Sequence, residues 1–131
     1  DLFEIEPVQK YTSEDLDWTD KKSRSTLEKN DPSSRPAIAE HVDHMDQYDT
    51  VFVGFPIWWY EAPRIIHTFL EEYDFTCKTI VPFATSGGSG MGKTSEILQK
   101  VCPAANVLAG RKMNASVSEA QVKKWMEEMG L

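Results

Sequence analysis

The sequence predicts an α/β fold in which a parallel sheet carries helices on both faces. Short apolar runs, typical of buried strands, alternate with amphipathic helical patterns along the second half of the chain. The 131 residues suffice for one domain, and the hydrophobic share of 40% is typical of a globular core. No internal repeat interrupts the pattern. We therefore expect a single domain over residues 1–131.

Charge and composition exclude several classes of partner. The formal net charge of −7 disfavours nucleic acid and anionic membrane surfaces, which require clustered Lys and Arg. No apolar run approaches the length of a membrane span. Cys77 and Cys102 lack a metal-type spacing and are typical of reduced thiols, so we expect a cytoplasmic protein. His41 and His44 are three positions apart but lack a full ligand set, so we expect no metal site.

The first third of the chain is mostly polar. Residues 2–5, Leu-Phe-Glu-Ile, alternate as a strand does. Residues 6–36 contain three prolines and few aliphatic side chains, which predicts a long excursion with short helical turns near 14–18 and 25–29. An apolar stripe over residues 37–45 predicts a short helix.

The most informative segment is a strand that leads into an aromatic loop. Residues 51–55, Val-Phe-Val-Gly-Phe, predict a buried strand. Directly after it come Pro56, Ile57, Trp58, Trp59 and Tyr60. Successive side chains of an extended segment alternate in direction, so at least one of the three adjacent rings should face a crevice or solvent. Ligands of open α/β sheets bind in such crevices, which predicts a flat, apolar ligand here.

Regular elements follow in strict alternation. A helix is predicted over residues 63–73, with Pro63 near its first turn. A strand is predicted over 79–84, where the internal Pro82 indicates an edge position or a bulge. The remaining predicted elements are a helix over 94–101, a strand over 106–113, and a final helix that Ser118 and Gln121 begin with a capping box.

Residues 87–94, Gly-Gly-Ser-Gly-Met-Gly-Lys-Thr, match the spacing of a Walker A phosphate loop. In that interpretation Lys93 reaches the terminal phosphates and Thr94 holds Mg²⁺. A nucleotide triphosphatase also needs an Asp at the end of a further strand. The strands over 51–55 and 106–113 end in Phe-Pro and in Arg-Lys-Met instead. We therefore expect no P-loop activity.

A second interpretation makes the glycine-rich segment one side of a ring-binding site. Glycines allow backbone to approach a planar ring closely, and Thr85 and Ser86 offer hydroxyls to its edge. A flexible turn without a ligand is the third interpretation.

Taken together, residues 54–60 and residues 83–90 (Phe-Ala-Thr-Ser-Gly-Gly-Ser-Gly) resemble the flavodoxin-like family, in particular its small bacterial flavodoxin branch. The resemblance implies a doubly wound sheet of strand order 2-1-3-4-5, with non-covalent FMN at the switch point. It also implies that the aromatic loop is one wall of the isoalloxazine site. The implied flavin-site residues are Pro56, Ile57, Trp58, Trp59, Tyr60, Thr85, Ser86, Gly87, Gly88 and Ser89.

The sequence departs from the family at two places. Flavodoxins bind the FMN phosphate with a loop between their first strand and first helix, and that unit has no counterpart here. The resemblance therefore implies an amino-terminally truncated domain, in which residues 2–5 fill the empty central place or the open strand edge supports a homodimer. Many flavodoxins also carry a glycine in the aromatic loop, where a peptide changes orientation on reduction. This chain has no glycine between Pro56 and Pro63.

The resemblance implies an FMN-binding electron-transfer protein with redox protein partners and no catalytic side chain. A close variant is an FMN reductase that uses NAD(P)H. A flavin-free, truncated relative that acts through oligomerisation or protein contacts is the alternative from another class. The P-loop interpretation predicts that ATP with Mg²⁺ protects the protein thermally and that Lys93→Ala abolishes this protection.

Overall fold

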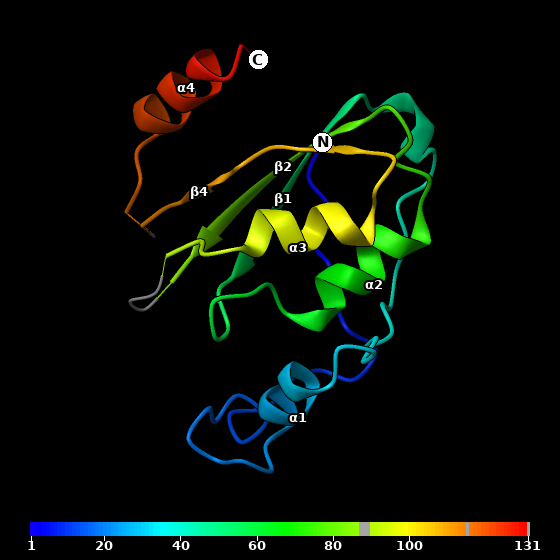
Figure 1. Cartoon of the computed structure of the whole chain (residues 1–131), viewed down its shortest axis with the longest axis vertical. Helices are drawn as coiled ribbons and strands as arrows, with labels where there is room; N and C mark the ends of the chain where they lie inside the picture. Colours follow the sequence, from blue (N-terminus) through cyan, green and yellow to red (C-terminus); the bar gives the residue numbers. More distant parts are fainter. Residues whose placement is uncertain (87–89, 115, 131) are drawn as a thin grey trace.

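The computed structural model describes residues 1–86, 90–114 and 116–130. In chain order its elements are α1 (Arg24–Asn30), the 3₁₀ helix η1 (Met45–Gln47), β1 (Thr50–Pro56), α2 (Arg64–Glu72), β2 (Thr79–Thr85), α3 (Thr94–Val101), β3 (Asn106–Val107), β4 (Arg111–Lys112) and α4 (Glu119–Glu128) (Figure 1). All strand pairs that join these elements are parallel. The predicted α/β class is confirmed.

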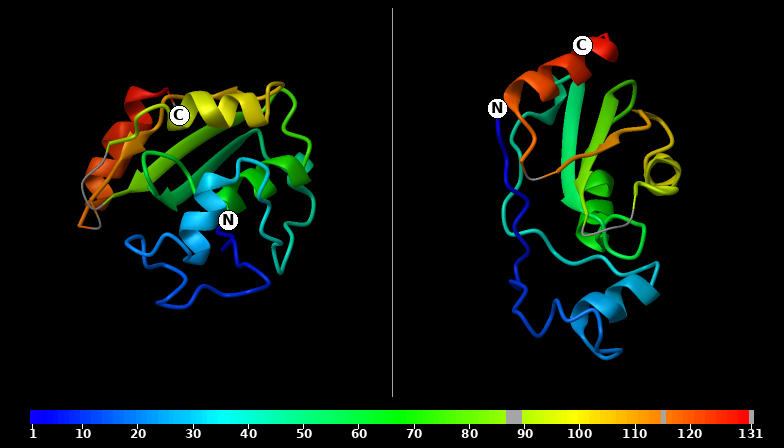
Figure 2. Two further views of the ribbon diagram at one scale, coloured as in Figure 1. Left: turned by 60° about the horizontal axis from the view of Figure 1, so that its bottom comes forward. Right: turned by 90° about the vertical axis from the view of Figure 1, so that its left-hand side faces the viewer.

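Helices lie on both faces of the sheet (Figure 2). α2 and α3 cover one face, where Val53 and Phe55 of β1 join the apolar core with Leu98 of α3. α4 lies on the opposite face, and its buried Trp125 makes an edge-on ring contact with Phe52 at 6.2 Å between centroids. Successive residues of β1 therefore pack alternately against the helices on the two faces of the sheet, as expected for a strand.

β2 is the central strand of the described sheet, so the edge position suggested by its proline is wrong. β1 pairs along one side of β2, whereas β3 and β4 pair along the other. On that second side, Leu108 N–H donates to the Ile80 carbonyl at 2.9 Å and Met113 N–H donates to the Ala84 carbonyl at 2.7 Å. Pro82 lies between these two bonds, where the predicted strand over 106–113 is interrupted. The absence of an N–H on Pro82 therefore removes no hydrogen bond between the strands.

The predicted strand over residues 2–5 is wrong, because the described structure shows no strand pairing for this segment. Phe3 and Ile5 are partly buried against the core, while Leu2 and Glu4 are exposed. The Phe3 ring stacks on Phe69 of α2 with centroids 6.4 Å apart. The alternation in the sequence thus reflects one-sided packing of an extended segment.

The predicted helix over residues 37–45 is also wrong. Val8 N–H donates to the Ala37 carbonyl at 2.9 Å, and Ala39 N–H donates to the Glu6 carbonyl at 2.7 Å. These bonds hold the segment extended, with Ile38 buried, and the helical turn that forms between this segment and β1 is η1. Tertiary pairing has overridden a weak helical pattern.

Local signals placed the other helices correctly. α2 has Pro63 at its N-cap, and α4 begins with the expected capping box between Ser118 and Gln121. Within the excursion, the turn expected near 25–29 is α1, which Ser23 caps. No helix among the described residues is long and apolar enough to cross a membrane.

Arg64 anchors the excursion to the body of the fold. Its side chain is buried, with only 5% of the residue exposed. The guanidinium donates from Nε to the Glu28 carbonyl at 3.1 Å and from Nη2 to the Lys29 carbonyl at 2.7 Å. The Glu28 carbonyl also accepts from the Asp31 N–H at 3.2 Å. A cation from the start of α2 thus supplies further donors to the carbonyls at the end of α1.

Candidate functional site

Two loops meet at the carboxyl edge of the sheet. β1 and β2 pair in register over their whole length, so that Pro56 lies opposite Thr85, and Ile57 N–H continues the ladder to the Thr85 carbonyl at 2.9 Å. The loops that follow both strands therefore begin side by side. The structure brings these sequence-predicted residues to one edge: Pro56, Ile57, Trp58, Trp59, Tyr60, Thr85 and Ser86. Gly87, Gly88 and Ser89 lie outside the described residues.

The aromatic loop is a tight turn with an uncommon backbone. Trp58 and Glu61 exchange two hydrogen bonds, N–H to carbonyl, at 2.9 and 3.1 Å. Between them, Trp59 and Tyr60 have φ values of +48° and +67°. Positive φ at both central residues is what a type I′ turn requires, and such turns favour Asn-Gly. Two bulky side chains in this region cost about 1–3 kcal/mol each.

The rings of the turn face different surroundings. Trp58 meets the ring of Tyr11 edge-on, with centroids 5.5 Å apart. Tyr11 is itself fixed by the Arg24 guanidinium, 3.8 Å above its ring, and by a hydrogen bond that it donates to Glu28 at 2.5 Å. Burial, together with the Glu28 carboxylate, raises the pKa of Tyr11. The Trp58 ring therefore packs against the excursion (residues 6–36), a contact that the sequence did not reveal.

The rings of Trp59 and Tyr60 make no aromatic contact of this kind among the described residues. Trp59 is partly buried, Tyr60 is 64% exposed, and neither ring contacts another aromatic ring in the described part of the chain. Thr85, at the end of the neighbouring strand, is also exposed. The edge thus presents two rings and a hydroxyl, which suits an aromatic ligand with polar atoms along one side.

Residues at and just before the start of α3 contact the aromatic turn. The hydroxyl of Thr94 lies 3.1 Å from the Tyr60 carbonyl oxygen and 2.5 Å from that of Met91, and Thr94 is 1% exposed. Gly92, with φ of +53°, lies beside the turn, where a Cβ would be in ordinary van der Waals contact with Tyr60 Cβ at 3.6 Å. This hydroxyl therefore connects the start of α3 to the aromatic turn.

Charged groups fix the other side of the turn. The Glu61 carboxylate lies 2.6 Å from Lys29 Nζ and 3.8 Å from Arg64 Nη1. Glu61 therefore joins the turn to both α1 and α2. Sequence reasoning missed this role, because nothing in the spacing of residues 29 and 61 signals their contact.

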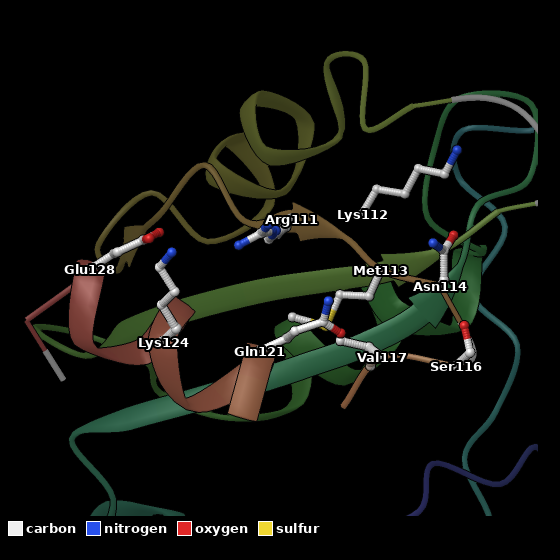
Figure 3. A pocket seen from close by; sticks show the side chains of 9 residues that line it. All are labelled: Arg111, Lys112, Met113, Asn114, Ser116, Val117, Gln121, Lys124 and Glu128. Carbon is white, nitrogen blue, oxygen red and sulfur yellow. The ribbon is translucent and has the colours of Figure 1, made fainter. Parts of the chain in front are cut away.

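A cleft of about 460 Å³ lies between β4, the segment after it and α4 (Figure 3). Arg111, Lys112 and Lys124 line it, and none of the three forms an ion pair among the residues described. Asn114, Ser116 and Gln121 add polar groups. Sequence reasoning missed this cleft, for which the adjacent cations at the end of a predicted strand are the only signal.

Comparisons with known proteins add a family match. A family model described as flavodoxin matches residues 1–129. A crystal structure of a "putative flavoprotein" from Bacteroides eggerthii DSM 20697 is 46% identical, with a TM-score of 0.94, and the match covers 100% of this chain and 82% of that one. Another, with the same description, from Bacteroides uniformis ATCC 8492, is 48% identical, with a TM-score of 0.89 and coverage of 95% and 80%. The comparison with curated proteins returned no match.

Proposed function

Because the chain belongs to the flavodoxin family, we propose that it binds FMN without a covalent bond and exchanges electrons with protein partners. The observation that carries this proposal is the turn that holds Trp59 and Tyr60 at positive φ, beside the end of β2. Backbone strain of this kind persists where the surrounding fold imposes it, often at ligand sites. The two similar Bacteroides proteins are each described as a "putative flavoprotein", which supports a flavin ligand.

The residues present fit the ring of a flavin. Trp59 and Tyr60 would form its apolar wall, and Thr85 would hydrogen-bond its polar edge. FMN, when bound, supplies the electron-transfer chemistry, while the protein binds and orients it. Electron-rich rings and a chain net charge of −7 both disfavour added negative charge on the ligand, so we expect a lowered reduction potential.

The acidic surface also suggests the kind of partner. A chain with net charge −7 associates fastest with a protein that presents a basic patch, and salt slows this association. Cytochrome c is a suitable basic acceptor for a test. We expect its reduction by the reduced, FMN-loaded chain to slow as ionic strength rises, whereas a rate independent of salt would contradict steering.

FMN titration, followed by quenching of flavin fluorescence, tests the binding itself. We expect saturable quenching, and we expect Trp59→Ala to weaken binding by about 1–3 kcal/mol through lost stacking and apolar contact. Trp18→Ala is the matched control, because Trp18 is 72% exposed in the excursion. Equal FMN affinity of the wild type and the Trp59 variant would mean that the aromatic turn is not part of the flavin site. An absence of quenching would refute FMN binding by this chain.

A further inference from the structure

The aromatic turn over residues 58–61 is held at both of its ends by the excursion. At the first position, the Trp58 ring meets the Tyr11 ring edge-on, with centroids 5.5 Å apart. At the last position, the Glu61 carboxylate lies 2.6 Å from Lys29 Nζ, in a partly buried pair with 18% and 28% of the side chains exposed. Solvent therefore screens this ion pair less than it would screen a pair on the surface.

Two successive residues of α1, Glu28 and Lys29, organise both contacts. The Tyr11 hydroxyl donates to Glu28 Oε1 at 2.5 Å, which fixes the ring that Trp58 meets. Lys29 pairs with the far end of the turn. The main-chain carbonyls of Glu28 and Lys29 accept from the buried Arg64, at 3.1 and 2.7 Å. Arg64 is the first residue of α2, directly after the turn, so the turn, α2 and α1 form a closed circuit of contacts.

The backbone of the turn requires such support. Trp59 and Tyr60 have φ values of +48° and +67°, a region that bulky residues adopt only under strain. Strain of this kind persists where the surrounding structure imposes it. The Thr94 hydroxyl lies 3.1 Å from the Tyr60 carbonyl oxygen, so α3 supports the centre of the turn. The excursion supports its two ends.

We propose that Tyr11, Glu28 and Lys29 form a clasp that holds the aromatic turn in the conformation that binds the flavin. Tyr11 and Lys29 are its positioning residues, because they act through the two ends of the turn and are not among the predicted flavin-site residues. The effect on affinity rests on the proposed function, whereas the effect on the turn needs no ligand. When the clasp is broken, fewer molecules hold the binding conformation, and the apparent Kd rises in proportion.

Hydrogen exchange of the turn amides tests the clasp on the flavin-free chain. The N–H groups of Trp58 and Glu61 donate across the turn at 2.9 and 3.1 Å, so their exchange reports its opening. We expect Lys29→Met to speed exchange at both amides about two- to fivefold, as expected for the loss of an ion pair that is partly solvated. Lys29→Arg keeps the charge and should restore slow exchange. Equal exchange in the wild type and in Lys29→Met would overturn the proposal.

Arg35→Met is the matched control, because it removes another ion pair between the excursion and α2. Arg35 Nη2 lies 3.0 Å from Glu71 Oε1, and neither residue pairs with residues 58–61 in the part of the chain that the structure describes. Arg35→Met should therefore leave exchange in the turn unchanged. The same acceleration in this control as in Lys29→Met would contradict a positioning role, because any loosening of the excursion would then suffice.

FMN titration gives the functional readout. Lys29→Met and Tyr11→Leu should each raise the Kd for FMN, by about two- to tenfold, whereas Arg35→Met should not. Because coupling between two sites is reciprocal, saturating FMN should slow protease cleavage within residues 6–36, and should do so less in Lys29→Met. Wild-type affinity in both clasp variants would overturn the proposal. An absence of binding by the wild type would refute the proposed function instead, and hydrogen exchange would then decide on the clasp alone.

Discussion

Gly110 lies directly against Pro82. A Cβ on Gly110 would be 2.3 Å from the Pro82 carbonyl oxygen and 2.8 Å from Pro82 Cγ, and Gly110 has φ of +74°. The two residues meet where the strand partner of β2 is interrupted between β3 and β4. The proline provides no N–H for a ladder at this point, and the glycine provides no side chain to keep the passing segment away. Each residue suits the other.

Gly110→Ala should therefore destabilise the fold by about 2–4 kcal/mol, because the new methyl group meets a backbone oxygen at a strained φ. Urea unfolding measures the loss. Gly130→Ala is the matched control, since Gly130 has φ of +77° and, its chain neighbours apart, no atom of the described residues lies within 4 Å of the position that a Cβ would take there. This control should cost only about 1 kcal/mol. Equal losses in both variants would mean that the contact with Pro82 contributes nothing.

Tyr60→Gly should stabilise the protein by about 0.5–1 kcal/mol, because glycine adopts the φ of +67° without strain. The same change should weaken FMN binding if Tyr60 forms part of the flavin wall. Tyr60→Ala removes the ring but keeps the strained backbone, so it should weaken binding without the gain in stability. Chemical denaturation and flavin titration of both variants separate the two effects. Stabilisation by alanine as well would show that the ring, and not the backbone, causes the strain.

Arg64→Met should destabilise the protein by about 2–4 kcal/mol, because it leaves two carbonyls of α1 without their buried donor. Protease cleavage within residues 6–36 should also become faster. Arg35→Met provides the comparison, since Arg35 and Glu71 form a solvent-exposed pair whose loss should cost at most about 1 kcal/mol. If cleavage stayed slow in Arg64→Met, the excursion would have another anchor.

His67 should make stability depend on pH. Burial, reinforced by the positive charges of Arg64 and Arg35, lowers its pKa to about 4 in the folded protein against 6.5 as an ordinary value, so the unfolded chain binds the proton more tightly. The free energy of unfolding should accordingly rise with pH between about 4 and 6.5, by on the order of 2 kcal/mol after allowance for solvent screening, and level off above. His67→Leu should flatten this slope, while the exposed His41→Ala should not. An unchanged slope in His67→Leu would assign it to carboxylates such as Glu71.

Much of the fold could be predicted from the sequence, because its strands and helices carry strong local signals. β1 is β-branched and aromatic, and α4 begins with a complete capping box. The errors fall where distant contacts decide. Residues 2–5 alternate because Phe3 packs on Phe69, and residues 37–39 are held extended by hydrogen bonds to residues 6–8. No local pattern distinguishes these arrangements from a strand or a helix.

The candidate site was predictable in its location but not in its geometry. Parallel strands with loops at one edge follow from the order of the elements, so the aromatic and glycine-rich loops could be placed together. The left-handed turn at Trp59 and Tyr60 could not, since turn rules assign that conformation to glycine and asparagine. The packing of Trp58 on Tyr11 depends on a contact across 47 positions, which no periodicity records.

The support of the turn by α3 has a consequence for the order of folding. Tyr60 and Thr94 are 34 positions apart and belong to one continuous β1–α2–β2–α3 unit. The contact between Phe3 and Phe69 joins residues that are farther apart in the sequence. Contacts that close shorter loops form with less entropic cost and earlier in time. We therefore expect the aromatic turn and its contact with α3 to form before the amino-terminal segment packs against α2. The chain would then acquire its ligand-facing surface before folding is complete.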